Sequence, residues 1–408
     1  MSGIGRISRF VSDWGQFRAF KRLPRDERRI VVYSESAQDW HHHATIIDEL
    51  TGRLGRSICY VASDPADPGL HQDNPNIRPF CIGDGFFRIV FFQTLQADLM
   101  VTQLLDLDNK DLKRSVHPVH YVYMFHSLIS THMADHENSF DHYDTILCST
   151  PYQVDEIRKR EMMQGFKPKR LAPHGYYRLE QLMAERREAP PLDGTPDEAG
   201  NIHVLLAPSW GEQTILNLFG MALTGILLDA GFILTLRPHF QTRWKTPEIL
   251  DAIVERYGTH PKFRLIEQMG ENDSLYDSHV MITDWSGAGM DYGFGLEKPV
   301  LYIDVPPKTR NDTWQKLGLD PFEMSVRETI GAVVAPDRLA DVPGEIRRLL
   351  ADPEQFRDQI AVARDASVFN LGSSSAAAAD AIVGIVDEPG DELGDELADK
   401  PAGNSTGA

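Results

Sequence analysis

One stretch of the chain, residues 278–304, combines residue types that bind phosphate. Residues 279–283 form an apolar run as short as a buried parallel strand, and Asp284 stands at its carboxyl end. Ser286 and Gly287 then open what should be a helix. The free amides of a first helical turn and the helix dipole attract anions, and glycine lets a phosphate approach the backbone. The stretch therefore favours a phosphate site, although any strand–turn–helix unit also needs a tight turn and a cap, which Ser286 would supply.

Other polar residues also follow expected strands. His126 comes directly after the strand at 120–125, and Arg237 and His239 follow the strand at 232–236. Ligands of open α/β sheets lie beyond the carboxyl ends of the strands, so these side chains are placed to contact a bound molecule. An imidazole titrates near neutral pH and can take a proton from a hydroxyl group, which makes His126 the candidate general base.

The elements that would position these residues come in two sets. Strands and helices alternate from residue 30 to 183, and the alternation restarts at residue 201 after a stretch rich in Pro, Gly, Glu and Asp. This pattern predicts an α/β protein of two Rossmann-like domains that face each other across a cleft. We expect the domains at 30–183 and 201–386, joined by a linker at 184–200. The acidic tail at 387–408 has low complexity and is predicted to be disordered.

Composition limits the class of protein. The chain has 408 residues, of which 42% are hydrophobic and 25% charged, as in a globular protein of two domains. The formal net charge of −19 argues against nucleic acid as a partner. No stretch reaches the roughly 20 apolar residues of a membrane span, and no signal peptide opens the chain. The few cysteines lack the spacing of a zinc site or a disulfide framework, so a reducing cytoplasm is the expected location.

Residues 1–29 differ from the rest of the chain. Apolar and aromatic residues recur there at helical spacing among arginines and lysines, which predicts an amphipathic helix. A basic helix with an aromatic face suits the surface of an anionic membrane, here the inner face of the cell membrane. The alternative is a helix docked on the protein's own body. The basicity of the segment within so acidic a chain favours the membrane by a small margin.

Histidine and glycine patterns elsewhere in the chain are weak signals. The tract at residues 41–43 suits a metal poorly, because adjacent residues of a helix point in different directions. Four other histidines could bind zinc together, but neither cysteine partners nor a zinc-protease spacing accompany them: His126, His132, His136 and His142. The glycines after Asp284 lack the spacing of a dinucleotide-binding motif, which would follow the first strand. We therefore predict no metal site and no NAD.

Five short motifs resemble those of the CDP-glycerol glycerophosphotransferases, the teichoic-acid and capsule polymerases of GT-B fold. LAPSW at 206–210, LRPH at 236–239 and ITDWSG at 282–287 are similar, in order and spacing, to that family's (Y)APT(F/W), R/K-x-H and ITDYSS motifs. FHS at 125–127 resembles its WHG motif, and HGYYR at 174–178 its GYPR element. The resemblance spans roughly residues 120 to 310. The final glycine of ITDWSG replaces the family's second serine, and the serine of FHS replaces the glycine after the histidine.

The resemblance implies transfer of glycerol phosphate from CDP-glycerol to a hydroxyl of a cell-surface polymer or its lipid-linked precursor, with release of CMP. His126 would take the hydroxyl proton, and cations with helix amides would offset the charge on the departing CMP. These groups would replace a magnesium ion, so no cofactor is predicted, although Mg²⁺ is left open. The catalytic candidates are His126 and His239. The candidates for binding the nucleotide and its pyrophosphate are Ser209, Arg237, His239, Asp284, Ser286 and Gly287, with Glu212 as a further contact.

Two other functions stay open. A sugar-nucleotide glycosyltransferase or a non-hydrolysing epimerase of GT-B fold would also bind a pyrophosphate in the second half of the chain. The protein could instead be an inactive scaffold in surface-polymer assembly. The presence of both His126 and His239 argues against a scaffold, because a scaffold needs neither histidine.

Overall fold

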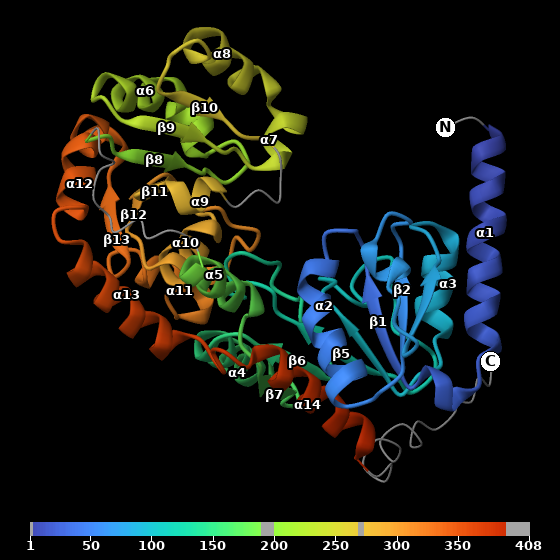
Figure 1. The fold of residues 1–408 in the computed structure, drawn as a ribbon. Helices are drawn as coiled ribbons and strands as arrows, with labels where there is room; N and C mark the ends of the chain where they lie inside the picture. The colour runs from blue at the N-terminus through green and yellow to red at the C-terminus, as the bar shows by residue number, and fades with distance from the viewer. Residues whose placement is uncertain (1–2, 189–199, 268–272, 389–408) are drawn as a thin grey trace, which may run out of the picture.

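The structure, a computed structural model, describes residues 3–188, 200–267 and 273–388. These residues form two lobes, each built on a parallel sheet packed with helices (Figure 1). In the described residues the first sheet has seven strands in the order β3-β2-β1-β4-β5-β6-β7. They are β1 (Ile30–Ser34), β2 (Ile58–Ala62), β3 (Ile77–Cys81), β4 (Leu99–Thr102), β5 (His120–Met124), β6 (Thr145–Cys148) and β7 (Arg170–Pro173).

The second sheet repeats this topology. Among the described residues it has six parallel strands in the order β10-β9-β8-β11-β12-β13. They are β8 (His203–Leu206), β9 (Ile233–Leu236), β10 (Phe263–Leu265), β11 (Val280–Thr283), β12 (Val300–Ile303) and β13 (Gly331–Val334). In each sheet the strand order reverses beside the first strand, between β1 and β4 and between β8 and β11. Ligands of doubly wound sheets bind at such switch points.

The helices connect and cover the strands. The described α-helices are α1 (Gly3–Arg22), α2 (Trp40–Asp48), α3 (Phe86–Thr94), α4 (Pro151–Gln164), α5 (Tyr177–Glu188), α6 (Ile215–Asp229), α7 (Phe240–Lys245), α8 (Pro247–Tyr257), α9 (Asp273–Asp277), α10 (Ala288–Leu296), α11 (Phe322–Ser325), α12 (Val342–Leu349), α13 (Pro353–Ser367) and α14 (Ser374–Asp387). Short 3₁₀ or π turns are η1 (Arg25–Arg28), η2 (Glu49–Arg53), η3 (Pro68–His71), η4 (Trp314–Leu317) and η5 (Pro336–Asp341).

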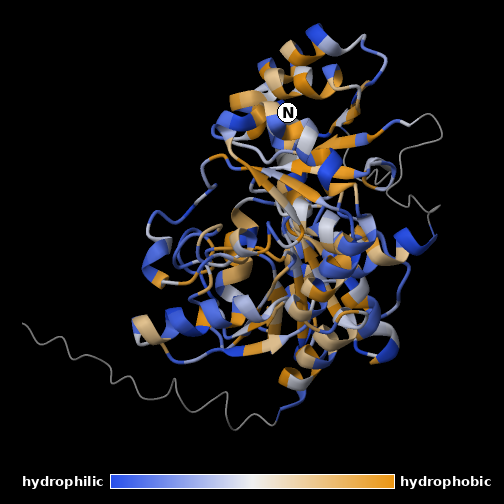
Figure 2. Cartoon of the chain, turned by 90° about the vertical axis from the view of Figure 1, so that its left-hand side faces the viewer, coloured by the Kyte–Doolittle hydropathy of each residue, from blue (hydrophilic) through white to orange (hydrophobic). Residues whose placement is uncertain are grey.

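The strands are buried on both faces, which explains why they read as continuous apolar runs in the sequence. Every residue of β1, β2, β4, β6, β11 and β12 is buried. Figure 2 shows these hydrophobic strands inside each lobe, among helices of mixed character. The polar residues that follow the strands therefore lie outside this apolar interior, at the carboxyl ends of the strands, where a ligand can reach them.

The chain passes between the lobes at both ends of the second one. After β7 it enters α5, whose Leu179 and Leu182 are buried against α10 of the second lobe at Gly295. After α13 it returns, and Ala378 and Ile382 of α14 pack on the first sheet. Figure 1 shows α13 and α14 running one after the other from the second lobe to the first.

The two passes touch each other. Gly175 has a φ of +101°, and a Cβ atom there would lie 2.3 Å from the carbonyl oxygen of Phe369, so glycine is required. The amide of Phe369 donates to the carbonyl of Ser149 at 3.0 Å. The side-chain amide of Asn370 donates to the carbonyl of Pro173 at 2.9 Å. Both connections between the lobes therefore meet at one place.

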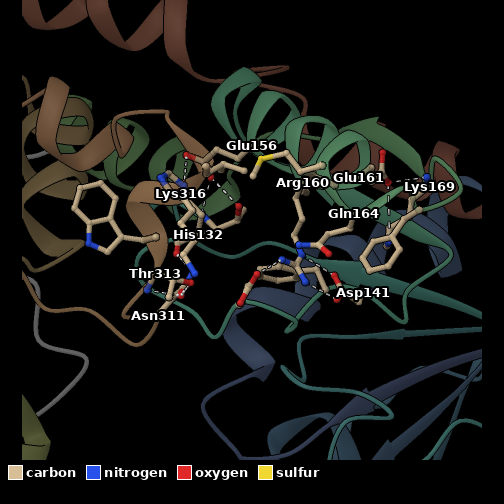
Figure 3. A pocket seen from close by; sticks show the side chains of 18 residues that line it. His132, Asp141, Glu156, Arg160, Glu161, Gln164, Lys169, Asn311, Thr313 and Lys316 are labelled. Atoms are coloured by element: carbon tan, nitrogen blue, oxygen red, sulfur yellow. Dashed lines mark hydrogen bonds and ion pairs between the residues drawn. The ribbon is translucent and has the colours of Figure 1, made fainter.

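The segment after β5 makes further contacts with the second lobe. Ser130 donates its amide at 2.9 Å and its hydroxyl at 2.8 Å to the carboxylate of Glu323. The Asn311 side chain donates to the carbonyl of His132 at 2.9 Å. Figure 3 shows this region, in which His132 and Glu156 of the first lobe and Asn311 of the second line one pocket. Because buried hydrogen bonds join the lobes here, the loop after His126 is held against the second lobe.

Helix α1 lies along the outside of the first lobe beside α3 (Figure 1). Phe20 is fully buried and packs edge-on against Phe91 with ring centres 5.0 Å apart. Phe10, Val11 and Trp14 are 55%, 58% and 45% exposed. The helix therefore docks on the protein's own body, which was one of the two alternatives, and still keeps an exposed apolar patch.

The predicted fold class, two Rossmann-like domains of GT-B type, is confirmed. The predicted domain boundaries do not coincide with the ends of the observed helices. The linker expected at 184–200 begins inside α5, and residues 189–199, like the tail from 389 onward, lie outside the described residues. Helix α14, which we expected in the second domain, lies on the first sheet because its small residues fit there. The division into separate domains stays a prediction.

Strand β3 was not predicted; it contains Pro79, which is tolerated because β3 is an edge strand.

Candidate functional site

Asp284 fixes the switch point of the second sheet. It follows β11 and is only 1% exposed. Its Oδ1 accepts a hydrogen bond from the Ser209 amide at 2.8 Å, and its Oδ2 accepts one from the Ile215 amide at 3.0 Å. Ile215 is the first residue of α6, so the carboxylate also lies at the positive end of that helix. Asp284, which we expected to bind the nucleotide, therefore uses both oxygens to position the loop after β8.

The start of α10 has the predicted small-residue geometry. Gly287 is the N-cap residue, and the Ser286 hydroxyl accepts from the Ala288 amide at 3.3 Å. A Cβ atom at Gly289 would lie 2.8 Å from the Tyr302 hydroxyl, so this position needs glycine to let the helix approach β12. At Gly287 a Cβ atom would lie 3.7 Å from a methyl group of Ile129, three residues after His126. The helix start thus approaches the first lobe.

His239 is held as a neutral hydrogen-bond donor. It caps α7, and its Nδ1 accepts from the Gln241 amide at 3.2 Å, which leaves the proton on Nε2. Burial, with the nearby Lys308 ammonium, lowers the pKa of His239 to about 4. Arg237 is half-buried at the end of β9, where its amide donates to the Leu206 carbonyl at 2.9 Å. The predicted pair thus supplies one permanent charge and one neutral donor.

A cluster of cations around Trp210 was not predicted. The Lys308 Nζ lies 3.8 Å from the centre of the Trp210 ring, and the Lys245 Nζ lies 4.0 Å from it. The His239 ring lies 6.0 Å from the same ring. Burial and the neighbouring charges of Arg310 and Lys245 lower the pKa of Lys308 to about 8, so it is still mostly protonated at pH 7. We call the following five residues the Trp210 cluster: Trp210, His239, Lys245, Lys308 and Arg310.

The Trp210 cluster lies at the β8–β11 switch point, where this fold binds ligands. Like charges held together repel, and that repulsion is relieved when a multiply charged anion binds between them. A ring face beside two ammonium groups also stabilises them by cation–π attraction. The arrangement is suited to a diphosphate. Its lysines come from the last turn of α7 and from the loop after β12, and the only sequence signal was the pair of basic residues Lys308 and Arg310, which follows a strand.

His126 stands where it was predicted, two residues after β5. Its Nδ1 is buried and has no hydrogen-bond partner among the described residues. Its ring lies 4.8 Å from the His42 ring. Burial lowers the pKa of His126, and the carboxylate of Asp39 opposes this shift. The imidazole is therefore neutral at pH 7, in the form that can accept a proton.

A small pocket in the first lobe, which we call the His126 pocket, surrounds this histidine. It is lined by His41, His42, Ile46, Met124, Phe125, His126, His174, Tyr176, Tyr177, Arg178, Ser374 and Ser375. Several of these residues belong to the motif at 174–178 that sequence analysis singled out. The contributions of α2 and α14 were not foreseen, because no local pattern shows that these helices meet.

Glu212, which we expected to contact the nucleotide, is exposed in the loop after β8. His132 lies 3.3 Å from the Glu156 carboxylate, an ion pair that raises the pKa of His132 against the effect of burial. His142 contacts the Asn109 side chain at 3.1 Å. In the part of the chain that the structure describes, no group of three or more His, Cys, Asp or Glu side chains could hold a metal ion.

Two facing Rossmann-like lobes of this topology define the GT-B fold. A variant of the wall teichoic acid polymerase TagF, soaked with CDPG, matches with a TM-score of 0.54 and 13% identity over 95% of this chain and 98% of that one. UDP-GlcNAc 2-epimerase from Methanocaldococcus jannaschii, in complex with UDP-GlcNAc and UDP, matches with a TM-score of 0.55 and 13% identity over 88% and 99%.

A glycosyltransferase from Rickettsia africae is also similar, with a TM-score of 0.51 and 11% identity over 89% of this chain and 100% of that one. No protein-family model and no curated protein sequence matches the chain. At identities this low, the structural likeness shows the fold. The choice among the activities of these proteins depends on the residues at the strand ends.

Proposed function

We propose that the protein transfers a glycerol phosphate unit from CDP-glycerol to a hydroxyl group of a cell-surface polymer or its lipid-linked precursor, and releases CMP. One observation carries this proposal. In one lobe, the buried imidazole after β5 has an Nδ1 without a hydrogen-bond partner among the described residues; in the other, cations gather at the β8–β11 switch point. The motif resemblance adds the choice of CDP-glycerol over other nucleotides.

The proposed reaction is an in-line substitution at the β-phosphorus of the donor. The acceptor oxygen forms a bond to this phosphorus while the bond to the bridging oxygen breaks, and the bridging oxygen leaves with CMP. His126 takes the proton from the attacking hydroxyl group. The negative charge that develops on CMP is offset by Arg237, Lys308 and Lys245 and by the Nε2–H of His239.

The same site can serve other nucleotide donors, and structural similarity to a UDP-GlcNAc 2-epimerase and a glycosyltransferase supports these alternatives. Melting temperature with CDP-glycerol, CDP, UDP-GlcNAc, UDP or GDP separates them. A ligand at a hundredfold excess over its Kd stabilises the native state by about 2.7 kcal/mol, which is easily detected. We expect the largest shift with the cytidine compounds. A larger shift with UDP-GlcNAc would favour the alternatives, and no shift with any nucleotide would favour the scaffold.

We further propose that the protein works at the inner face of the membrane, where a lipid-linked acceptor lies. Among the described residues, no helix combines the length and the hydrophobicity that a membrane crossing requires. Helix α1 instead exposes Phe10, Val11 and Trp14, and Arg18 and Arg22 are exposed at four-residue steps along the same side.

Flotation with anionic vesicles tests this second proposal. The double substitution Phe10→Ser and Trp14→Ser should lower the bound fraction several-fold at low salt, since it removes the aromatic contacts. Gln16→Ser, on an exposed position of the same helix, is the matched control. Equal binding of all three proteins would contradict the proposal.

A further inference from the structure

Three helices begin at the His126 pocket. The residues that line it include the second and third residues of α2, the first two of α5 and the first two of α14: His41, His42, Tyr177, Arg178, Ser374 and Ser375. These helices have 9, 12 and 14 residues, so each carries a developed dipole. The N-terminus of a helix acts as about half a positive charge, because its first amides have no partner within the helix.

One permanent cation, Arg178, lines the pocket beside the three helix starts, while burial keeps His42 and His126 neutral at pH 7. Burial, with the neighbouring His126, His43, His41 and Arg178, lowers the pKa of His42 to about 3. Three carboxylates lie at the margin, and one of them, Asp291, accepts from the Tyr176 hydroxyl at 3.4 Å. Glu180 accepts from the Ser374 amide at 3.0 Å and the Gly372 amide at 2.9 Å, and Asp39 accepts from the Glu35 amide at 2.9 Å and the Ser36 amide at 3.2 Å. Glu180 thus already accepts the first amide of α14, and Asp39, the N-cap residue of α2, binds the loop before that helix.

A second observation indicates a ligand. The Ser374 residue is only 1% exposed, lines the pocket, and its hydroxyl has no hydrogen-bond partner among the described residues. The adjacent Ser375 hydroxyl, by contrast, bonds to Thr45 at 2.8 Å. His126 also presents a buried nitrogen without a partner. Buried polar groups are almost always paired, so two such groups in one pocket mark a place where a bound molecule completes the hydrogen bonds.

We propose that the His126 pocket binds a phosphate ester group of the acceptor, next to the hydroxyl that His126 deprotonates. Donors that arrive from three helix starts surround a tetrahedral oxyanion better than a planar carboxylate. The identity of the bound molecule as the acceptor rests on the proposed function, whereas the anion site rests on the pocket alone. The site differs from the Trp210 cluster, which lies in the other lobe and would hold the donor.

Binding of inorganic phosphate, followed by the ring NMR signals of His126, tests the proposal. The signal is assigned by its loss in His126→Gln. We expect a saturable shift in the wild-type protein. Arg178→Gln should weaken it by about tenfold or more, because a charged hydrogen bond is lost, and Ser374→Ala by about three- to tenfold.

Lys308→Gln is the matched control, because it removes a charge from the Trp210 cluster and should leave phosphate binding at His126 unchanged. The proposal is overturned if the His126 signal shows no saturable shift, or if Ser374→Ala and Arg178→Gln bind phosphate as the wild type does. Should Arg178→Gln fail to fold, the smaller change Ser374→Ala decides.

The phosphate experiment tests the anion site separately from the binding of the nucleotide donor. Saturable phosphate binding at His126 without any cytidine-nucleotide binding would refute the proposed function and leave the anion site intact. Nucleotide binding without a phosphate effect on His126 would refute the anion site and leave the proposed function intact.

Discussion

The His126 pocket and the Trp210 cluster lie at strand ends of two sheets with one topology, yet their chemistry differs. The pocket holds imidazoles that burial keeps neutral, with the pKa of His42 lowered to about 3. The cluster holds a lysine that burial and neighbouring cations leave with a pKa of about 8, and it is charged at pH 7. The same backbone arrangement thus carries a candidate proton acceptor in one lobe and a candidate anion-binding site in the other, and the side chains at the strand ends decide which.

Removing the base should have the largest effect and should leave the cluster intact. We expect His126→Gln to lower turnover with CDP-glycerol by about two to four orders of magnitude, the usual range for a lost general base. The affinity for CMP should stay within about twofold of the wild-type value, because the CMP site lies in the other lobe and distant sites are affected independently. Steady-state kinetics and calorimetry measure the two quantities, and the exposed His71→Gln is the control. Full activity in His126→Gln would remove the proposed mechanism.

Removing a permanent charge from the other lobe should give the opposite pattern. Arg237→Ala should weaken CMP and CDP-glycerol binding by about 1.5–3 kcal/mol, the value of a charged hydrogen bond. Calorimetry of Arg237→Ala against Arg264→Ala, an exposed arginine on β10, makes the comparison. If both variants bind nucleotide like the wild type, Arg237 has only a structural role.

The lysine of the cluster should make nucleotide affinity depend on pH. Burial and neighbouring cations lower the pKa of Lys308 to about 8, so the free protein loses this charge as the pH rises through 8. Because the anion binds the protonated lysine, affinity should be constant below pH 8 and fall above it, by at most about tenfold per pH unit. Lys308→Arg should move the fall beyond the measured range. An unchanged fall in that variant would assign it to another group.

The smallest effect is expected at the start of α10. Ser286→Ala removes one hydroxyl, while the backbone amides of the helix remain, so nucleotide affinity should fall by only about 0.5–1.5 kcal/mol. Calorimetry beside Arg237→Ala measures the difference. A loss as large as that of the arginine variant would show that the hydroxyl, and not the helix start, holds the phosphate.

The positions of Arg237, His239 and His126 could be predicted because each follows an apolar run in a strictly alternating chain. The sequence does not show which way a strand-end side chain points. Asp284 has the pattern of a ligand contact, but both of its oxygens accept backbone amides. Lys245 and Lys308, 63 residues apart in sequence, both reach Trp210, and only the assembled sheet brings them together.

The packing of α14 on the first sheet was equally hidden, because a row of alanines is compatible with many surfaces. Its contact with α2 depends on where the chain returns after α13. Local patterns therefore predicted most of the strands and the position of His126 after β5, whereas the cluster and the three-helix pocket depend on tertiary contacts between distant segments.

The meeting of the two chain passes at Gly175 and Phe369 has a mechanical consequence. With both covalent connections at one place, a turn of one lobe about that contact would leave either sheet intact but would have to break the hydrogen bonds from Ser130 to Glu323 and from Asn311 to His132. It would also alter the separation between Ile129 and Gly287, and with it the distance from His126 to the Trp210 cluster. These hydrogen bonds therefore fix the angle between the lobes, and with it the distance between the two candidate sites.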